Sequence, residues 1–119
     1  MQDFENIINS REEKRYNVRL ALKLRTKESD PLNERRYSLA NISMGGVFVN
    51  YRGDCHVDNI IGCKIYLGEQ DMDFIVGDGH IVWFRIDKEE LTPGFGFKFQ
   101  HMDENSKNAL KRFLRKLDY

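Results

Sequence analysis

Nine residues near the middle of the chain, Asn41 to Val49, read NISMGGVFV and place polar residues and two glycines directly before strand-forming residues. Asn and Gly tolerate positive φ, so a hairpin turn accounts for part of this pattern. Asn41, Ser43 and Gly46 also have the spacing N-x-S-x-x-G, which is more than a turn requires. An amide, a hydroxyl and a residue without a side chain suit a ligand that approaches the backbone closely. The spacing therefore indicates either turn chemistry or a ligand site.

A second group with ligand chemistry lies near the N-terminus, in the segment REEKRYNVR at residues 11–19. Arg11, Arg15 and Arg19 are four residues apart, so two overlapping R-x-x-x-R patterns are present. A guanidinium binds phosphate, or the O6/N7 edge of guanine, through two parallel hydrogen bonds, and its plane stacks on a base. If it binds no ligand, such a polar segment is typical of a solvated arm. We expect it to be mobile without a ligand.

The composition predicts one compact domain without a strong overall field. The 119 residues are 40% hydrophobic and 12% aromatic, which is sufficient for a single core. Lys plus Arg and Asp plus Glu number 19 each, so the formal net charge is zero and any anion site must be local. The apolar runs are far shorter than the roughly 20 residues that cross a bilayer, and the first residues lack a signal-peptide pattern. We therefore expect a cytoplasmic protein without membrane insertion.

Short apolar segments with a period of two predict a chain of β-strands. The first is expected to begin at Leu20, because Leu20, Leu22 and Leu24 alternate with Ala21 and Lys23. Gly77 and Gly79 indicate a bulge or a sharp bend within a long later strand. The other strands are expected at residues 36–42, 46–50, 64–67, 74–86 and 94–100.

The end of the chain changes to a helical period. The apolar positions 110, 113, 114 and 117 follow the spacing of a helix that buries one stripe. We expect this helix over residues 103–117, with Asp103, Asn105 or Ser106 as its N-terminal cap. The basic residues of its last turns suit the helix dipole.

Many short antiparallel strands followed by one helix predict a mainly β fold. We expect a small six-stranded antiparallel (split or Greek-key) β-barrel with a C-terminal α-helix. The whole chain, 1–119, is read as one domain. Its parts are an N-terminal segment with the arginine arm at 1–19, the barrel at 20–101 and the helix at 103–117.

This order of motifs and elements resembles the PilZ domain, a bacterial receptor family for the second messenger cyclic di-GMP. The family signature has R-x-x-x-R directly before the first strand, and [D/N]-x-S-x-x-G at the hairpin between the second and third strands. Asn41, Ser43 and Gly46 match the second part. The later segments GHIVWFRI and GFGFKF, and the closing helix, are similar to the end of the family's fold. The resemblance covers residues 11–117 and implies a PilZ-like barrel.

The resemblance also implies which residues bind the ligand. Arg15 and Arg19 are the preferred pair, because the second arginine of the family leads directly into the first strand and Arg19 precedes Leu20. Arg11 with Arg15 satisfies the same spacing, so that alternative stays open. The expected cyclic di-GMP contacts are Lys14, Arg15, Arg19, Asn41, Ser43, Gly45 and Gly46, with Arg11 as an additional candidate.

The function implied by the resemblance is that of a receptor and adaptor, not an enzyme. Cyclic di-GMP would order the arginine arm, and the chain would pass the signal to an effector protein that the sequence does not identify. We expect a monomer or weak dimer, and no cofactor. Whether one ligand or a stacked pair binds stays open.

The sequence also suggests three other interpretations. Cys55, His56 and Cys63 match no common zinc spacing, so no metal site is expected. A PilZ-like domain that contacts proteins but does not bind the nucleotide stays an alternative. A small barrel that binds single-stranded nucleic acid is disfavoured by the zero net charge, so neither DNA nor RNA is expected as a partner.

Overall fold

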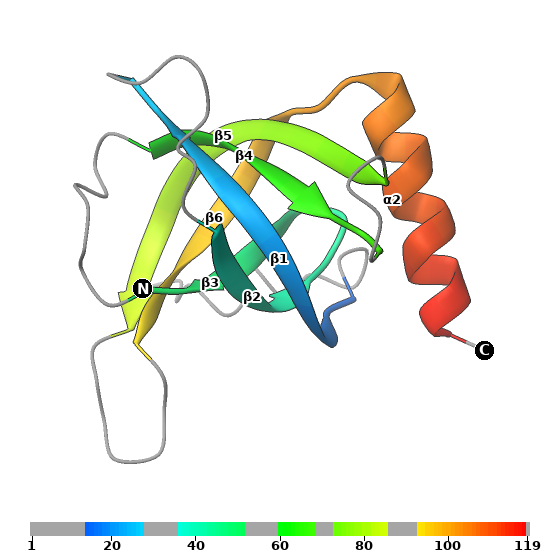
Figure 1. Cartoon of the computed structure of the whole chain (residues 1–119), viewed down its shortest axis with the longest axis horizontal. Coiled ribbons are helices and arrows are strands. Elements are labelled where there is room, and N and C mark those ends of the chain that lie inside the picture. The colour runs from blue at the N-terminus through cyan, green and yellow to red at the C-terminus, as the bar shows by residue number, and fades with distance from the viewer. Residues whose placement is uncertain (1–13, 28–35, 52–59, 69–72, 86–92, 119) are drawn as a thin grey trace, which may run out of the picture.

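The computed structural model describes residues 14–27, 36–51, 60–68, 73–85 and 93–118. Within these residues it contains six strands and one helix, which Figure 1 shows as a curved sheet with the helix beside it. The elements are β1 (Tyr16–Thr26), β2 (Arg36–Ile42), β3 (Gly46–Asn50), β4 (Ile60–Tyr66), β5 (Phe74–Arg85), β6 (Gly94–His101) and α2 (Glu104–Leu117).

The strands form a closed barrel in the order β1-β2-β3-β6-β5-β4, and every neighbouring pair is antiparallel. The pairing of β1 with β4, which sets Leu24 opposite Cys63, completes the ring. Closure gives each of the six described strands a hydrogen-bonded neighbour on both sides. The expected mainly β fold, a six-stranded antiparallel barrel with a C-terminal helix, is confirmed.

The barrel interior is filled by side chains from alternate positions of the strands. Leu22 and Leu24 of β1 point inward and are almost completely buried, whereas the flanking Lys23 and Arg25 are half-exposed. Burial of apolar surface is the main stabilising contribution to such a core. The core residues of the strands are joined by Leu110 and Leu114 of α2, so the helix covers part of the barrel.

The start of α2 is fixed to the barrel by polar contacts. The backbone N–H of Ser106 donates to Asp103 Oδ1 at 2.7 Å, which makes Asp103 the N-terminal cap, one of the three expected candidates. The buried Ser106 hydroxyl accepts a hydrogen bond of 3.1 Å from the backbone N–H of Val76 in β5. The helix therefore begins at a defined point on β5, and Figure 1 shows the two elements side by side.

β1 begins at Tyr16, four residues before the expected start at Leu20. Tyr16 pairs with Ile42 of β2, and the Tyr16 and Val18 side chains pack against the core. The period of two thus extends back into the segment that we expected to be a solvated arm. The boundary was misplaced because the charged residues around Tyr16 and Val18 obscure this short apolar alternation.

The remaining boundaries are close to those expected. β2 and β3 begin and end where predicted, and β4 begins four residues earlier, at Ile60. β5 runs to Arg85, and the expected last residue, Ile86, lies outside the described residues. The predicted irregularity in β5 is a register shift against β6 between Asp78 and Gly79. A Cβ atom at Gly79 would overlap the carbonyl oxygen of Lys98, so only glycine fits this close approach.

Candidate functional site

The Ser43 hydroxyl organises the turn between β2 and β3. Its oxygen accepts hydrogen bonds from the backbone N–H groups of Gly45 and Gly46, at 3.1 and 3.2 Å. The backbone N–H of Ser43 donates to the Gly46 carbonyl at 2.9 Å, and the residue is only 2% exposed. Ser43 therefore fixes the shape of the N-x-S-x-x-G turn from within.

The two glycines of this turn contact β6. A Cβ atom on Gly46 would overlap the carbonyl oxygen of Phe97, so the close β3–β6 pairing requires glycine there. The Gly45 carbonyl accepts a 2.8 Å hydrogen bond from the backbone N–H of Phe99. Hydrogen bonds within the turn and a hydrogen bond to β6 therefore fix the position of the turn.

Asn41, the first residue of the motif, lies in β2 opposite Asn17 of β1 and Phe48 of β3. Its side-chain oxygen Oδ1 is buried and has no hydrogen-bond partner within the described parts of the chain. Leaving such a buried acceptor unpaired costs about 1–3 kcal/mol. An unsatisfied buried group of this kind indicates either strain or a donor supplied by a ligand, a water molecule or residues outside the described ranges.

The arginine motif lies beside this asparagine. Arg19 and Asn17 are exposed on β1, whose inward-facing residues alternate with them. Arg15 is half-buried directly before β1, and Lys14 is exposed. Arg11 lies outside the described residues. The register Asn17 to Asn41 therefore brings the two sequence motifs together on adjacent strands.

An open hollow of about 470 Å³ lies on this outer face of the barrel. Its volume falls within the range of roughly 300–1,000 Å³ typical of ligand pockets. No carboxylate is present among its lining residues that the structure describes, and two of them are arginines from different strands. We call it the arginine hollow, and its lining residues are Asn17, Val18, Arg19, Leu39, Ala40, Asn50 and Arg85.

Arg85 is the site residue that the sequence did not predict. Its guanidinium carbon lies 4.3 Å from the ring centroid of Phe48, the outward-facing and nevertheless buried residue of β3. Trp83, two residues earlier in β5, lies 5.1 Å from the same ring. A period of two places Arg85 and Trp83 on one face of β5, which was a possible sequence signal for this site. Arg85 lies 39 positions after Gly46, so nothing in the sequence indicated that it lies near the turn motif.

The chain directly before β1 contacts the end of α2. Lys14 Nζ forms a 3.1 Å ion pair with Asp118 Oδ1, and the Tyr16 hydroxyl donates to Asp118 Oδ2 at 2.8 Å. The Tyr16 and Lys14 hydrogen bonds lower the pKa of Asp118, and the hydrogen bond to Asp118 raises the pKa of Lys14. Lys14, Tyr16 and Asp118 form what we call the Asp118 cluster, which joins the arginine motif to the helix.

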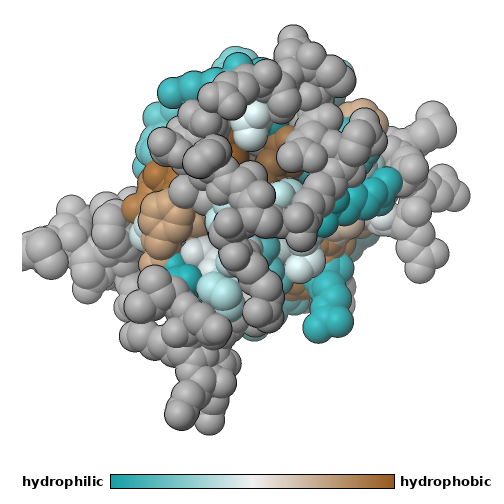
Figure 2. Space-filling model, turned by 60° about the vertical axis from the view of Figure 1, so that its left-hand side comes forward, coloured by the Kyte–Doolittle hydropathy of each residue, from teal (hydrophilic) through white to brown (hydrophobic). Residues whose placement is uncertain are grey.

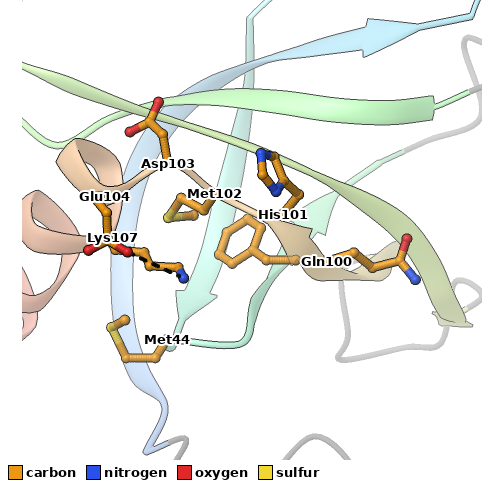
Figure 3. Close-up of a pocket in the computed structure, with 8 residues that line it drawn as sticks. Met44, Gln100, His101, Met102, Asp103, Glu104 and Lys107 are labelled. Carbon is orange, nitrogen blue, oxygen red and sulfur yellow. Dashed lines mark ion pairs between the residues drawn. The ribbon is translucent and has the colours of Figure 1, made fainter.

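A second hollow, of about 390 Å³, lies between the turn and the start of α2. Figure 3 shows Met44, from the turn, on one side of it, with the ion pair between Lys107 and Glu104 at 3.9 Å on the helix side. Asp103 and Glu104 contribute carboxylates to its lining, so it suits a dianionic ligand less well than the arginine hollow does.

Other features of the described residues offer no competing chemistry. Cys63 is buried in the core, where desolvation raises its thiol pKa to about 12, so it stays protonated. No group of three or more His, Cys, Asp or Glu side chains is placed for a metal within the described ranges, and Cys55 and His56 lie outside them. No helix in the part of the chain described here is long and apolar enough to span a bilayer.

Few large apolar side chains are exposed in the part of the chain that the structure describes. Among the coloured residues of Figure 2, hydrophobic and hydrophilic ones alternate over short distances on the face shown. Among the residues that the structure describes, the exposed large apolar side chains are Phe74, Val76, Phe84 and Leu117. They come from both ends of β5 and from the end of α2, so they do not mark one continuous docking face.

This chain is similar to known proteins in family and in fold. The family model described as the PilZ domain matches residues 9–116. None of the curated proteins is a significant match to this sequence. Three solved structures share the fold, each with less than 25% sequence identity.

The first is the inhibitor of motility MotI/DgrA from Bacillus subtilis, with a TM-score of 0.68 and 17% identity, covering 88% of this chain and 50% of that one. The second is Escherichia coli YcgR in complex with c-di-GMP, with a TM-score of 0.66 and 14% identity, covering 92% of this chain and 46% of that one. The third is the PilZ domain of Escherichia coli YcgR with c-di-GMP, with a TM-score of 0.65 and 16% identity, and the match covers 92% of both chains. This chain therefore spans about half the length of the first two proteins.

Proposed function

The chain belongs to the PilZ domain family, and from this we propose that it is a receptor that binds cyclic di-GMP in the arginine hollow and signals to a partner protein. The observation that carries the proposal is the β1–β2 register. It sets Asn17, two residues before Arg19, opposite Asn41, so residues from both signature motifs lie beside one another. Two related structures that contain c-di-GMP, both of E. coli YcgR, support the choice of ligand.

Charge complementarity supports an anionic ligand at this place. Cyclic di-GMP has two phosphates and two guanines, and the arginine hollow has Arg19 and Arg85 with no described carboxylate in its lining. A hydrogen bond to a charged group contributes roughly 1.5–3 kcal/mol. Micromolar affinity corresponds to about 8 kcal/mol, so a few such bonds account for much of it. In this proposal Arg15 and Arg19 bind the phosphates, and Lys14 and Arg11 add further positive charge.

The turn would act mainly through its shape. Ser43 uses its hydroxyl oxygen to accept from two backbone amides, so its contribution is to position Gly45 and Gly46 and the backbone that the ligand approaches. The buried Oδ1 of Asn41 would accept a hydrogen bond from a donor that arrives with the bound state. Either a guanine N–H or an arginine of the arm has the required chemistry.

Signalling would proceed through the arginine motif to the helix. Arg15 lies between Lys14 and Tyr16, and both of these neighbours contact Asp118 at the end of α2. If the ligand holds Arg15 in one position, it also fixes the residues that form the Asp118 cluster. The surface that combines the N-terminal segment and α2 would then differ between free and bound states, and a partner could distinguish them.

Calorimetry with cyclic di-GMP tests the proposal. The wild-type chain should bind, Arg19→Ala should weaken binding roughly ten- to hundredfold through the lost charged hydrogen bonds, and GTP should not substitute. Arg112→Ala removes another exposed arginine, on α2 outside the hollow, and serves as the matched control. No heat from the wild-type protein, with its fold intact, would leave a PilZ-like domain for protein contacts alone.

A salt series separates this proposal from single-stranded nucleic-acid binding. Affinity for an oligonucleotide depends steeply on salt because binding releases counterions along the strand. Preferential binding of an oligonucleotide over cyclic di-GMP, with that steep salt dependence, would contradict the proposed function.

A further inference from the structure

We infer that Arg85, which belongs to neither signature motif, is a specificity-determining residue that binds the O6/N7 edge of a guanine in the ligand. This inference rests on the proposed function. Four observations carry it: the position of Arg85 in the arginine hollow, its contact with Phe48, the packing of Trp83 against that ring, and its origin on a different strand from Arg19.

Arg85 reaches the hollow by crossing a strand. Its backbone pairs with Gly94 of β6, yet its guanidinium carbon lies 4.3 Å from the ring centroid of Phe48 in β3. Phe48 faces outward, since its neighbours Val47 and Val49 belong to the core. A cation over an aromatic face is attracted to the ring. The guanidinium is therefore held above β3, beside Asn50 of the same hollow.

The Phe48 ring that Arg85 contacts is closely packed by its neighbours. The Trp83 ring lies 5.1 Å from that of Phe48, and a Cβ atom on Gly96 would overlap the indole. Phe48 itself is 1% exposed, so the ring under the guanidinium has little room to turn. A pre-positioned guanidinium loses little conformational entropy on binding and imposes a fixed hydrogen-bonding direction.

The two arginines of the hollow come from either side of β2. Arg19 lies on β1, whereas the Arg85 guanidinium lies over β3, and β2 separates the two strands. Neighbouring strands are about 4.8 Å apart, so the backbone of Arg19 lies roughly 10 Å from the strand beneath the Arg85 guanidinium. In a guanine nucleotide a ribose and most of the base lie between the phosphate and the O6/N7 edge. With a phosphate at Arg19, Arg85 faces the base.

This assignment predicts selectivity between bases. Guanine presents two acceptors, O6 and N7, to the paired N–H donors of an arginine. Adenine presents a donor, N6–H₂, where guanine has O6, so one of the two hydrogen bonds is replaced by a donor–donor contact. Arg85 should therefore favour cyclic di-GMP over cyclic di-AMP, even though the phosphates and riboses of the two ligands are identical.

The experiment compares both cyclic dinucleotides by calorimetry on the wild-type chain, Arg85→Ala, Arg85→Lys and the Arg112→Ala control. Arg85→Ala should weaken cyclic di-GMP binding roughly ten- to hundredfold and reduce the preference over cyclic di-AMP by a similar factor. Arg85→Lys keeps the charge without the two-pronged geometry, so it should not restore the preference. Melting curves establish that the variants are folded.

Fluorescence gives an independent readout, because Trp83 is the only tryptophan in the chain and its ring lies 5.1 Å from Phe48, the ring that Arg85 contacts. Saturating cyclic di-GMP should change its emission in the wild-type protein and less so in Arg85→Ala. Unchanged cyclic di-GMP affinity in a folded Arg85→Ala variant would overturn the inference but leave the proposed function intact. An equal loss for both dinucleotides would show a phosphate contact and also overturn it. Failure of the wild-type chain to bind would overturn both.

Discussion

The Tyr16 hydroxyl donates a 2.8 Å hydrogen bond to the carboxylate of Asp118, so the first residue of β1 is joined to the residue that follows α2. The two residues are 102 positions apart in the sequence. Lys14 contacts the other oxygen of the same carboxylate. Arg15, a predicted ligand contact, lies between Lys14 and Tyr16 in the sequence. The Asp118 cluster therefore joins the segment that contains Arg15 to the end of the helix.

Removing the Tyr16 hydroxyl should loosen this connection without unfolding the barrel. In Tyr16→Phe the ring keeps its packing on the core, while the hydrogen bond to Asp118 is lost. We expect faster amide exchange in residues 14–19 and little change in melting temperature, since exposed polar pairs contribute little stability. Glu104→Gln, at the opposite end of α2, is the matched control. Equal exchange rates in wild-type and Tyr16→Phe proteins would show that the contact does not order the segment.

The cluster should persist from mildly acidic to mildly alkaline pH. The folded-state pKa of Asp118 is lowered from its ordinary 3.8, so its contribution is present above that value and is lost as the pH falls through the lowered pKa. The pKa values of Lys14 and Tyr16 are raised from 10.5 and 10.0, so their contributions are present below those values and are lost at higher pH. NMR titration of the Asp118 carboxyl carbon measures this directly; a midpoint at or above 3.8 would contradict the contacts.

The turn should depend on Ser43 for its stability as well as for ligand binding. Ser43→Ala removes the acceptor of two backbone amides at a buried position, and we expect a loss of about 1–3 kcal/mol in the free energy of unfolding. Urea unfolding without ligand measures this loss. Ser38→Ala, which removes a half-buried hydroxyl bonded to Asn50, is the control. If Ser43→Ala weakened binding with unchanged stability, its hydroxyl would contact the ligand and not the turn.

Cys63 should be chemically silent in the folded protein. It is completely buried and burial raises its pKa to about 12, so almost no thiolate exists at neutral pH. In a Cys55→Ser background a thiol reagent should label Cys63 only under unfolding conditions. Rapid labelling of the native protein at pH 8 would show that β4 opens readily, contrary to its pairing with both β1 and β5 in the closed barrel.

The sequence predicted the elements best where turn chemistry and apolar alternation agree. β2 and β3 flank a turn whose Asn, Ser and Gly residues mark both strand ends, and their bounds were found without error. Asp103 was a correct cap because its side chain precedes a helical apolar stripe. The start of β1 was missed, because only Tyr16 and Val18 continue the alternation among charged neighbours.

The site was only partly predictable for a different reason. Arg19 and Asn41 belong to short motifs with a fixed spacing, whereas Arg85 enters the hollow by crossing β6 to reach Phe48. Such a contact depends on strand order, in which β5 is separated from β3 by β6. The periodicity of a single strand does not reveal the order of strands in the barrel. Arg85 could therefore be assigned to the hollow only from the structure.

The most direct test of the account is to map the bound ligand by NMR amide shifts during a titration with cyclic di-GMP. The account predicts saturable shifts concentrated in the arginine hollow, at Asn17, Arg19, Ala40, Asn50 and Arg85, with smaller shifts at Asp118. Saturable shifts confined to the hollow between Met44 and the start of α2, or no shifts at all in a folded sample, would contradict it.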